Sequence, residues 1–347
     1  MRKFIVKNKI ITDESDCFVI AEIGNNHKGE IKIAKKMFEV AKKCGADAVK
    51  LQTRNNKFLF TKKMYNSVYN SYNSYGKTYG LHRDKLEFGK KDYLYLKKYA
   101  EDLGLIFFST PFDFKSVDFL EKIDTPLYKI GSGDLTNIPL IEYINSTKKP
   151  IILSTGGGNI ADVVRAQRSL KKNKNLAILQ CTSAYPCNAE DLNVRVIETY
   201  RKKFKNNIIG LSDHLSGVSS SILAYALGAR IIEKHFTLDR SWKGTDHSFS
   251  LEPKGLEKLI NYLRESRKAL GTGKKIALNK EKKPIFKMAK KLVASKNLYK
   301  GKKLVRDDIA IKSPNDGVAP YHLKKFIGKT LKVDLKQDEN LNFKLIK

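Results

Sequence analysis

The sequence predicts an α/β fold, a (β/α)8 TIM barrel followed by a small β-rich C-terminal domain. Eight short apolar runs rich in Val, Ile and Phe recur along the chain, and a longer segment of helical period follows each of them. A Gly-containing break after the last helical segment indicates where the small domain begins. With 347 residues and 41% hydrophobic content, the chain is long enough to build both parts around ordinary cores.

The eight apolar runs are the predicted barrel strands. They occupy residues 18–23, 48–52, 106–109, 127–130, 151–154, 177–180, 208–211 and 231–235. A doubly wound open sheet is the main alternative, but its first strand is normally followed by a G-x-G-x-x-G fingerprint. Only Gly24 follows the first run here, so the closed barrel is favoured.

The barrel is expected to occupy residues 1–272. After its last predicted helix comes Gly271-Thr-Gly-Lys-Lys, which predicts a helix stop and a linker over residues 273–290. In residues 291–347, short β-prone pieces alternate with turns. This segment is too short to be an enzyme by itself, so it is expected to be an accessory domain.

The formal net charge of +31 is typical of some nucleic-acid-binding proteins. Here, however, lysines occur in every segment, in pairs such as Lys35-Lys36 and Lys202-Lys203, as on solvated helix faces. No recognised nucleic-acid module accompanies the charge, so we expect no nucleic-acid partner.

The cysteines and the apolar segments indicate a cellular compartment. Four cysteines, at positions 17, 44, 181 and 187, form no C-x-x-C pair, which disfavours a disulfide framework or a zinc ribbon. No apolar stretch has the length needed to cross a bilayer, and the first 13 residues mix charges with short apolar runs. We therefore expect a cytoplasmic protein without a membrane partner.

Polar residues gather at the C-terminal ends of the predicted strands, where TIM barrels carry their chemistry. In chain order these ends carry Glu22, Lys50, Ser109-Thr110, Lys129 with Ser132, Ser154-Thr155, Thr182-Ser183, Ser212 with His214, and His235. Placing so many charges at one rim costs free energy through desolvation and like-charge repulsion. We therefore interpret this rim as an active site.

His214 and His235 end adjacent predicted strands, where two imidazoles can converge on one divalent cation. Two protein ligands leave positions open for water and substrate oxygens. This favours a Lewis-acid Mn or Mg site over a closed structural zinc site. The alternative is that one or both are hydrogen-bonded barrel histidines that bind no metal.

Lys50 and Lys129 lie on different predicted strands and are expected to reach the same cavity, where two ammonium groups favour a phosphate or carboxylate ligand. Ser132, Ser183 and Ser212 can add hydroxyl donors. The alternative makes one lysine a Schiff-base nucleophile, as in barrel aldolases. The clustered pair beside two histidines favours anion binding.

Three further features lie near the predicted rim. Glu22 begins a polar turn and can orient hydroxyls or move a proton, or else only pair with Lys50. Cys181 has no partner histidine in a recognised cysteine-hydrolase pattern, so it is expected to pack. The Tyr/Asn/Ser-rich residues 65–79 follow the second strand, and long loops at this face usually bind or cover substrate.

Six motifs, in this order, resemble those of the sialic acid (N-acetylneuraminate) synthase family over nearly the whole chain. They are Ala21-Glu-Ile-Gly-Asn-Asn-His27, Lys50-Leu-Gln, Tyr128-Lys-Ile-Gly-Ser-Gly133, Cys181-Thr-Ser-Ala-Tyr-Pro186, Leu211-Ser-Asp-His214 and Glu233-Lys-His-Phe-Thr237. The resemblance implies condensation of phosphoenolpyruvate with N-acetylmannosamine or its 6-phosphate, with release of phosphate. It also implies that the small domain is an antifreeze-like (SAF) domain, which in the family caps the partner's active site in a domain-swapped homodimer.

The resemblance also implies roles for individual residues. Catalysis would involve Glu22, His214 and His235, and both histidines would bind the metal. The residues that would bind phosphoenolpyruvate are Lys50, Lys129, Ser132, Ser183 and Ser212. The residues that would line the sugar pocket are Asn73, Thr110, Asp134, Tyr185 and Asp246, with Lys312 from the tail.

Departures from the better-known bacterial pattern bear on the substrate. Ser183 stands where those enzymes have Asn, and Lys312-Ser313-Pro314 replaces a Lys-Arg-Pro-Gly segment whose Arg contacts the sugar. Residues 75–80, 181–186 and 242–248 instead resemble the animal-type synthases, which use the 6-phosphate. Synthesis of a related nonulosonic acid (legionaminic, pseudaminic or deaminated sialic acid) and Schiff-base aldol chemistry remain the alternatives.

Overall fold

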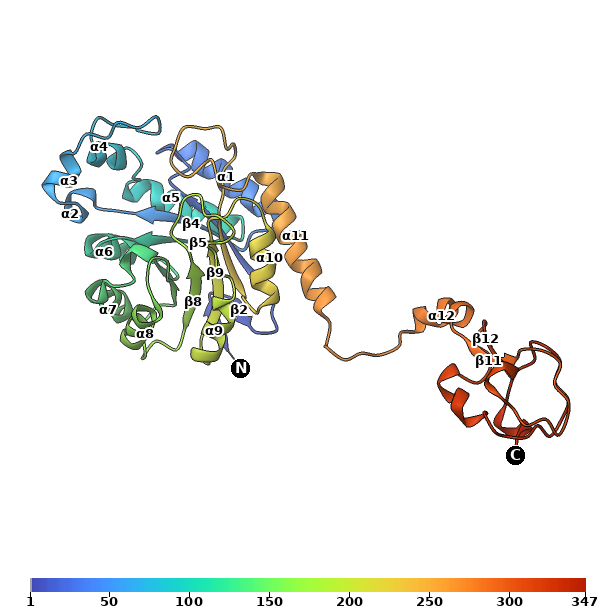
Figure 1. Cartoon of the computed structure of the whole chain (residues 1–347). Coiled ribbons are helices and arrows are strands. Elements are labelled where there is room, and N and C mark those ends of the chain that lie inside the picture. The colour runs from blue at the N-terminus through green and yellow to red at the C-terminus, as the bar shows by residue number, and fades with distance from the viewer. Residues whose placement is uncertain (1) are drawn as a thin grey trace. The chain divides into compact units, whose positions relative to one another are not determined.

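The computed structural model describes residues 2–347, and the chain folds as two compact units, Met1–Gly271 and Thr272–Lys347 (Figure 1). The larger unit is built on a closed barrel of parallel strands, in which the order around the barrel is β10-β3-β4-β5-β6-β7-β8-β9. The barrel strands are β3 (Phe18–Gly24), β4 (Ala48–Thr53), β5 (Ile106–Pro111), β6 (Tyr128–Ile130), β7 (Ile151–Ser154), β8 (Leu176–Cys181), β9 (Ile208–Asp213) and β10 (Ile231–His235). The predicted TIM barrel is confirmed.

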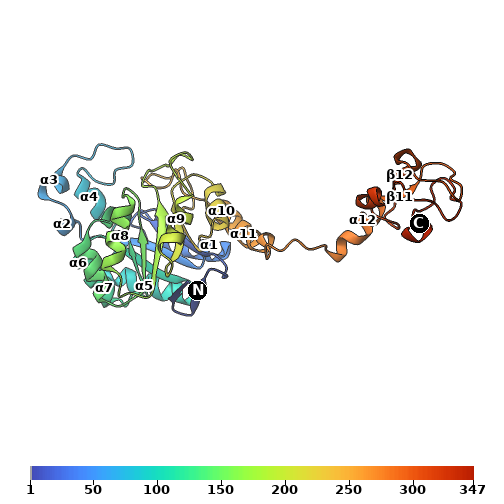
Figure 2. The same ribbon diagram turned by 60° about the horizontal axis from the view of Figure 1, so that its bottom comes forward.

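Helices surround the strands of this unit (Figure 2). They are α1 (Ile31–Cys44), α2 (Asn56–Leu59), α3 (Lys62–Asn66), α4 (Tyr79–Asp84), α5 (Lys90–Asp102), α6 (Phe114–Lys122), the 3-10 turn η1 (Ser132–Asp134), α7 (Ile138–Ser146), α8 (Ile160–Ser169), α9 (Val196–Lys203), α10 (Ser219–Ala226) and α11 (Pro253–Leu270). Among residues 2–347, no helix combines the length and apolarity needed to span a membrane.

Helix α1 illustrates why these segments are helical and where they stop. Its buried residues are Ala34, Met37, Phe38 and Ala41, which recur at the spacing of one helix face and pack on the barrel. The helix ends at Gly45, whose φ of 95° is in the left-handed region that only glycine adopts without strain.

The interior of the barrel is divided into an apolar half and a polar half, because alternate residues of each strand face the axis. The apolar half lies at the N-terminal strand ends. Its buried residues are Phe18, Ile20, Ala48, Ile106, Phe108, Leu127, Ile152, Ala177, Leu179, Ile208 and Ile231. The polar half begins two residues further along each strand. Its buried residues are Glu22, Lys50, Thr110, Lys129, Ser154, Ser212, Glu233 and His235.

An N-terminal hairpin that the sequence analysis did not anticipate completes the apolar half. Strands β1 (Lys3–Val6) and β2 (Lys9–Thr12) pair antiparallel. Their buried side chains, Phe4, Val6 and Ile11, belong to the same cluster as the apolar barrel residues. The hairpin therefore closes the N-terminal end of the barrel with apolar contacts.

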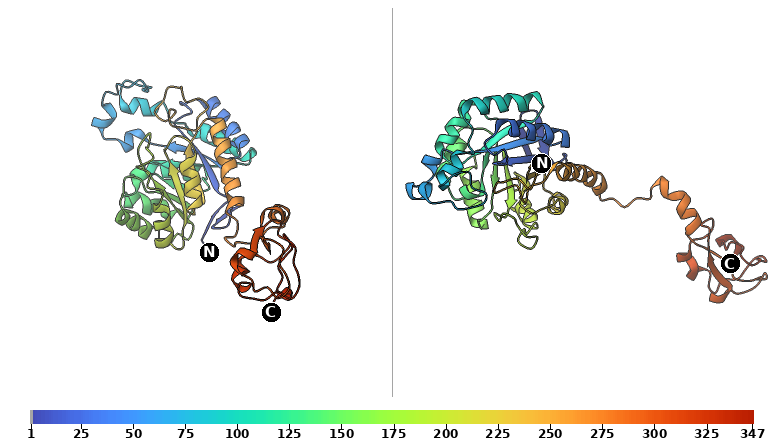
Figure 3. Two further views of the ribbon diagram at one scale, coloured as in Figure 1. Left: turned by 45° about the vertical axis from the view of Figure 1, so that its right-hand side comes forward. Right: turned by 90° about the horizontal axis from the view of Figure 1, so that it is seen from above.

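The smaller unit has its own core (Figure 3). Strands β11 (Lys291–Ala294) and β12 (Ile309–Lys312) pair antiparallel, and the remaining regular elements are η2 (Asn279–Glu281), α12 (Lys282–Met288), η3 (Arg306–Asp308), η4 (Pro320–Lys325) and η5 (Phe343–Leu345). Leu292, Leu304, Phe326 and Leu341 are fully buried in one cluster. Residues 273–290, expected to be a linker, contain η2 and the short helix α12.

Candidate active site

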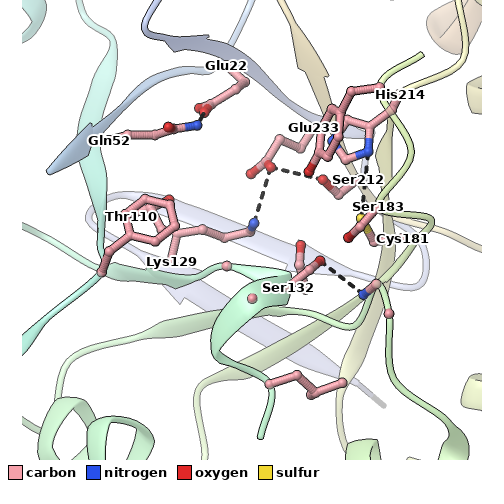
Figure 4. Close-up of a pocket in the computed structure, with 18 of the residues that line it drawn as sticks. Glu22, Gln52, Thr110, Lys129, Ser132, Cys181, Ser183, Ser212, His214 and Glu233 are labelled. Atoms are coloured by element: carbon pink, nitrogen blue, oxygen red, sulfur yellow. Dashed lines mark hydrogen bonds and ion pairs between the residues drawn. The ribbon is translucent and has the colours of Figure 1, made fainter. Parts of the chain in front are cut away.

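A cavity of about 490 Å³ opens in the polar half of the barrel (Figure 4). Every barrel strand contributes to its wall. The strand residues that line it are Glu22, Lys50, Gln52, Thr110, Lys129, Ser154, Cys181, Ser212, Glu233 and His235. The cavity also receives Ser132, Ser183, Tyr185 and His214 from the segments that follow the strands.

Glu22 and Lys50 form a buried ion pair on neighbouring strands. Lys50 Nζ lies 2.7 Å from Glu22 Oε2 and donates to Thr110 Oγ1 at 2.8 Å. Gln52 Nε2 donates to the other oxygen, Glu22 Oε1, at 2.7 Å. The side chains that were expected to hold charge at this rim are therefore joined in one network.

Glu233 lies between the two lysines, and the sequence analysis did not select it. Its Oε1 is 3.2 Å from Lys129 Nζ and accepts from Ser212 Oγ at 3.0 Å (Figure 4). Its Oε2 is 3.9 Å from Lys50 Nζ. The site thus holds two ammonium groups and two carboxylates.

The environment separates the pKa values of these two carboxylates. Burial raises the pKa of Glu22, although Lys50 opposes this. Burial also raises the pKa of Glu233, but Lys129 and Lys50 outweigh it and hold the pKa below its usual range. Glu233 is therefore the more acidic of the two carboxylates, and Glu22 is the one that takes up a proton more readily.

Hydroxyl and backbone donors line another part of the cavity. Gly156 N donates to Ser132 Oγ at 3.0 Å. A Cβ atom at Gly156 would lie 2.2 Å from Ser183 Oγ, so only glycine allows the two serines to approach this closely. Ser154 Oγ is buried and has no hydrogen-bond partner among the described residues, which leaves it available to a ligand.

The two predicted metal ligands lie together on one wall, with ring centroids 5.4 Å apart. His214 Nδ1 lies 2.8 Å from the Thr182 carbonyl oxygen. Because a carbonyl can only accept, Nδ1 donates and the lone pair is on Nε2. His235 is neutral near pH 7, because burial lowers its pKa to about 3, and its Nδ1 has no hydrogen-bond partner among the described residues.

These two imidazoles fit a divalent cation with open coordination positions. In residues 2–347, no cluster of three or more His, Cys, Asp or Glu side chains surrounds a metal-sized site, so the protein supplies too few ligands for a closed structural site. Burial lowers the pKa of His214, but the Cys181 thiol and the Thr182 carbonyl outweigh it and raise the pKa overall. A cation at His214 would therefore compete with a proton.

The remaining predicted residues divide into two groups. Ser183, Thr110 and Tyr185 line the cavity, and the Tyr185 ring lies 4.2 Å from the His214 ring. Asp246 lies at the edge, with Oδ2 3.8 Å from His235 Nδ1, but is not part of the wall.

Three predicted residues lie away from the cavity wall. Asn73 Oδ1 accepts from Gly244 N at 3.1 Å and so joins two loops, and Asp134 is buried against Asn137. Lys312 belongs to the smaller unit, where it pairs with Asp338.

The sequence analysis did not select Glu233 and Gln52 as site residues. The alternation of side chains along a strand is the signal that could have found both. Glu233 precedes His235 by two positions and Gln52 follows Lys50 by two, so each must face the same side of its strand as its neighbour. Cys181 was expected only to pack. It is buried, but it also lines the cavity, with Sγ 3.9 Å from His214 Nδ1.

Comparison with known proteins identifies relatives of both units. Residues 37–275 match the model of the NeuB family, and residues 291–346 match the SAF domain. The human N-acetylneuraminate-9-phosphate synthase is 39% identical over 332 residues, which cover 95% of this chain and 92% of that protein. The N,N'-diacetyllegionaminic acid synthase of Campylobacter jejuni is 37% identical, over 92% of this chain and 97% of that protein.

The fold comparison agrees with these matches. The crystal structure of N-acetylneuraminic acid (sialic acid) synthetase from Leptospira borgpetersenii superposes with a TM-score of 0.73 at 34% identity, over 82% of this chain and 95% of that one. The polar cavity thus lies in a barrel shared with sialic acid and related nonulosonic acid synthases. The chain belongs to the NeuB family and carries a C-terminal SAF domain.

Proposed function

We propose that this protein condenses phosphoenolpyruvate with an N-acylmannosamine-type sugar to give a nonulosonic acid and phosphate. The observation that carries the proposal is the single cavity in which two buried lysines and several hydroxyl groups lie beside two histidines. A phosphorylated enol acid needs donors of this kind, and an aldehyde needs polarisation beside them. The names of the relatives, N-acetylneuraminate-9-phosphate synthase and N,N'-diacetyllegionaminic acid synthase, support the same reaction class.

In this proposal, the lysines and serines bind the anionic groups of phosphoenolpyruvate. Lys50 and Lys129 supply the positive charge, and Ser132, Ser183 and Ser212 supply neutral donors around the Gly156 amide. Lys50, Lys129 and Ser212 are buried and held by neighbouring side chains, so they lose little conformational freedom when the substrate binds. Holding the substrate in one pose supplies much of the rate enhancement.

The bond changes follow from the two substrates. C3 of phosphoenolpyruvate forms a bond to the aldehyde carbon of the open-chain sugar, which leaves C2 electron-deficient. Water adds to C2, the C2–O bond breaks, phosphate leaves, and C2 becomes the keto group of the product. Glu22, paired with Lys50 and Gln52, carries the proton in this scheme: it accepts the proton that the attacking water loses and passes it to the former aldehyde oxygen, while the second proton of the water leaves with phosphate. A divalent cation, Mn or Mg, bound by His214 and His235 would supply Lewis-acid polarisation of that oxygen.

The favoured acceptor is N-acetylmannosamine 6-phosphate, which would give N-acetylneuraminate 9-phosphate. Support comes from the human relative and from cations beyond the Gln52 edge of the cavity. Arg54 donates to Gln52 Oε1 at 2.5 Å and covers the Phe112 ring at 4.1 Å. Arg54 Nη1 also lies 3.5 Å from Glu87 Oε1, so its charge is partly compensated. Arg83 and Lys243 contact tyrosine rings, and no ion pair of either is found within residues 2–347. These cations suit a distal phosphate.

Phosphate release from phosphoenolpyruvate with a panel of acceptors tests the proposal. The panel contains N-acetylmannosamine, its 6-phosphate, mannose 6-phosphate and a diacetamido sugar. We expect release with at least one acceptor and the highest kcat/KM with N-acetylmannosamine 6-phosphate. No release with any of them contradicts the reaction. Borohydride trapping of a lysine–substrate adduct, insensitive to chelators, would favour the Schiff-base aldolase instead.

We also propose that the protein works as a homodimer in which the SAF domain of one chain completes the site of the other. Support comes from Ile285, Phe286 and Met288 on and around helix α12, which are about half exposed although they are apolar. A chain truncated after Lys274 should bind phosphoenolpyruvate but lose most turnover. Mixing it with the His214→Ala chain should restore activity, and full activity of the truncated monomer would contradict the proposal.

A further inference from the structure

A buried ion pair lies on the outer side of the two strands that lead to the histidines. Asp213 ends β9 and Lys234 lies in β10, and the two residues are paired in the register of these strands. Lys234 Nζ lies 2.8 Å from Asp213 Oδ2, and the side chains are 1% and 0% exposed. Ser212 and Glu233, one residue earlier in each strand, face the cavity, so strand alternation directs Asp213 and Lys234 away from it.

Asp213 is held by donors from three elements besides β9. Ser220 Oγ and Ser221 Oγ, in the first turn of α10, donate to its Oδ2 at 2.6 and 2.7 Å. Leu215 N donates to its Oδ1 at 3.0 Å. With Lys234 from β10, these contacts fix the carboxylate in one orientation in a region without water access.

Lys234 contacts the chain on both sides of His214. Besides Asp213, its ammonium group donates to the carbonyl of Leu215. The next residue after Lys234 is His235. One side chain therefore ties the strand that ends in His235 to the segment that carries His214.

We propose that the Asp213–Lys234 pair is a positioning device that sets the relative placement of His214 and His235 for divalent-cation binding. The inference rests on the metal site of the proposed function. Neither residue reaches the cavity, so the pair acts only through the histidines. Partners that orient metal ligands from behind typically change metal affinity by about 10- to 100-fold.

The test measures Mn²⁺ alone binding to the full-length, metal-free protein by calorimetry. The double variant Asp213→Asn/Lys234→Met keeps the side-chain sizes and removes both charges, so that no lone charge is left buried. The matched control is Lys9→Met, which breaks a Lys–Asp pair at the opposite end of the barrel, where Lys9 Nζ lies 2.9 Å from Asp47 Oδ1. Phosphoenolpyruvate affinity and hydrogen exchange over residues 211–218 are measured on the same samples.

We expect the double variant to bind Mn²⁺ about 10- to 100-fold more weakly. Exchange over residues 211–218 should be faster, with phosphoenolpyruvate affinity unchanged and the Lys9→Met control like the wild type. If the double variant does not fold, Ser220→Ala/Ser221→Ala gives the same readout without removing a charge. Wild-type Mn²⁺ affinity in a folded variant overturns the positioning role alone. Absence of Mn²⁺ binding by the wild type overturns the proposed metal site and this inference with it.

Discussion

The two halves of the barrel interior are built by the same strands but differ in every physical respect. In the apolar half, Phe18 and Ile20 pack with the N-terminal hairpin and contribute stability through burial. Two residues along the same strand, Glu22 pairs with Lys50 in a buried network whose desolvation costs free energy. The comparison teaches that apolar burial in one half offsets the free energy lost by desolvating charges in the other. Changes in the polar half should alter chemistry, and changes in the apolar half should alter folding.

The largest effect is expected from removing the two histidines. Turnover of the His214→Ala/His235→Ala protein, or of the wild type after exhaustive chelation, should fall at least about a thousandfold, because one electrostatic stabiliser of a developing oxyanion alone is worth about 10²–10³. Steady-state phosphate release measures this. Lys202→Ala/Lys203→Ala, at the exposed end of α9, is the control and should be fully active. Undiminished turnover without metal would contradict the role proposed for these two histidines in catalysis.

Next in size is a change in the apolar half. Phe4→Ala removes a fully buried ring of the hairpin and should lower the free energy of unfolding by about 3–5 kcal/mol. Urea denaturation measures the loss, and phosphoenolpyruvate affinity below the transition should be unchanged. A Phe4→Ala protein of normal stability would mean that the hairpin does not contribute to the barrel core.

The Lys129→Ala variant should weaken phosphoenolpyruvate binding by at least about tenfold and leave sugar binding nearly unchanged. Losing one partner of a desolvated charge contact typically costs about 2–5 kcal/mol. Calorimetric titration of phosphoenolpyruvate measures the change, with Lys91→Ala on the exposed side of α5 as the control. Equal affinity in the two variants would place the anion site elsewhere.

The smallest effect is a pH dependence that arises only at the polar end of the barrel. Burial lowers the pKa of His27 and His235 to about 3 and that of His82 and His247 to about 4. Unfolded histidines titrate at about 6.5, so between about pH 4 and 6.5 these four side chains bind more protons in the unfolded chain than in the folded one. The stabilisation that these four histidines contribute is therefore complete above this window and is lost as the pH drops through it. Burial raises the pKa of Glu22 and Glu87, which gives a contribution of opposite sign.

Each of these histidines changes the free energy of unfolding by at most about 1.4 kcal/mol per pH unit. Urea denaturation of the metal-free protein at pH 7.5, 6.5 and 5.5 measures the slope. Replacing one of the four, as in His82→Gln, should make stability fall less steeply toward pH 5.5 than in the wild type. An unchanged slope would contradict the neutral state of that side chain.

The barrel was predictable because apolar runs and helical periods are local signals. Each of the eight predicted runs matches a barrel strand within two residues at either end. The hairpin was missed because its alternation is short, four residues per strand, and is interrupted by charges. Its role depends on packing against the barrel, and no local pattern reports that contact.

The site was predictable to the extent that strand parity decides which side chains face the axis. Lys50, Lys129 and His235 lie on strands, and the structure brings them to one cavity. Asn73 and Asp134 lie in segments between strands, where the path of the chain depends on tertiary contacts, and they lie off the wall. Glu233 lies two residues before His235 on the same strand, so the alternation of side chains that predicted His235 could also have predicted Glu233.

The most direct test of the central claim uses phosphoenolpyruvate labelled with ¹⁸O in the oxygen that bridges C2 and phosphorus. The reaction proposed for the polar cavity breaks the C2–O bond, so the label should appear in the released phosphate, together with a nonulosonic acid whose formation depends on the acceptor sugar. Mass spectrometry of both products gives the answer. Unlabelled phosphate, with the label retained on C2 of the organic product, would show P–O cleavage and would contradict the account.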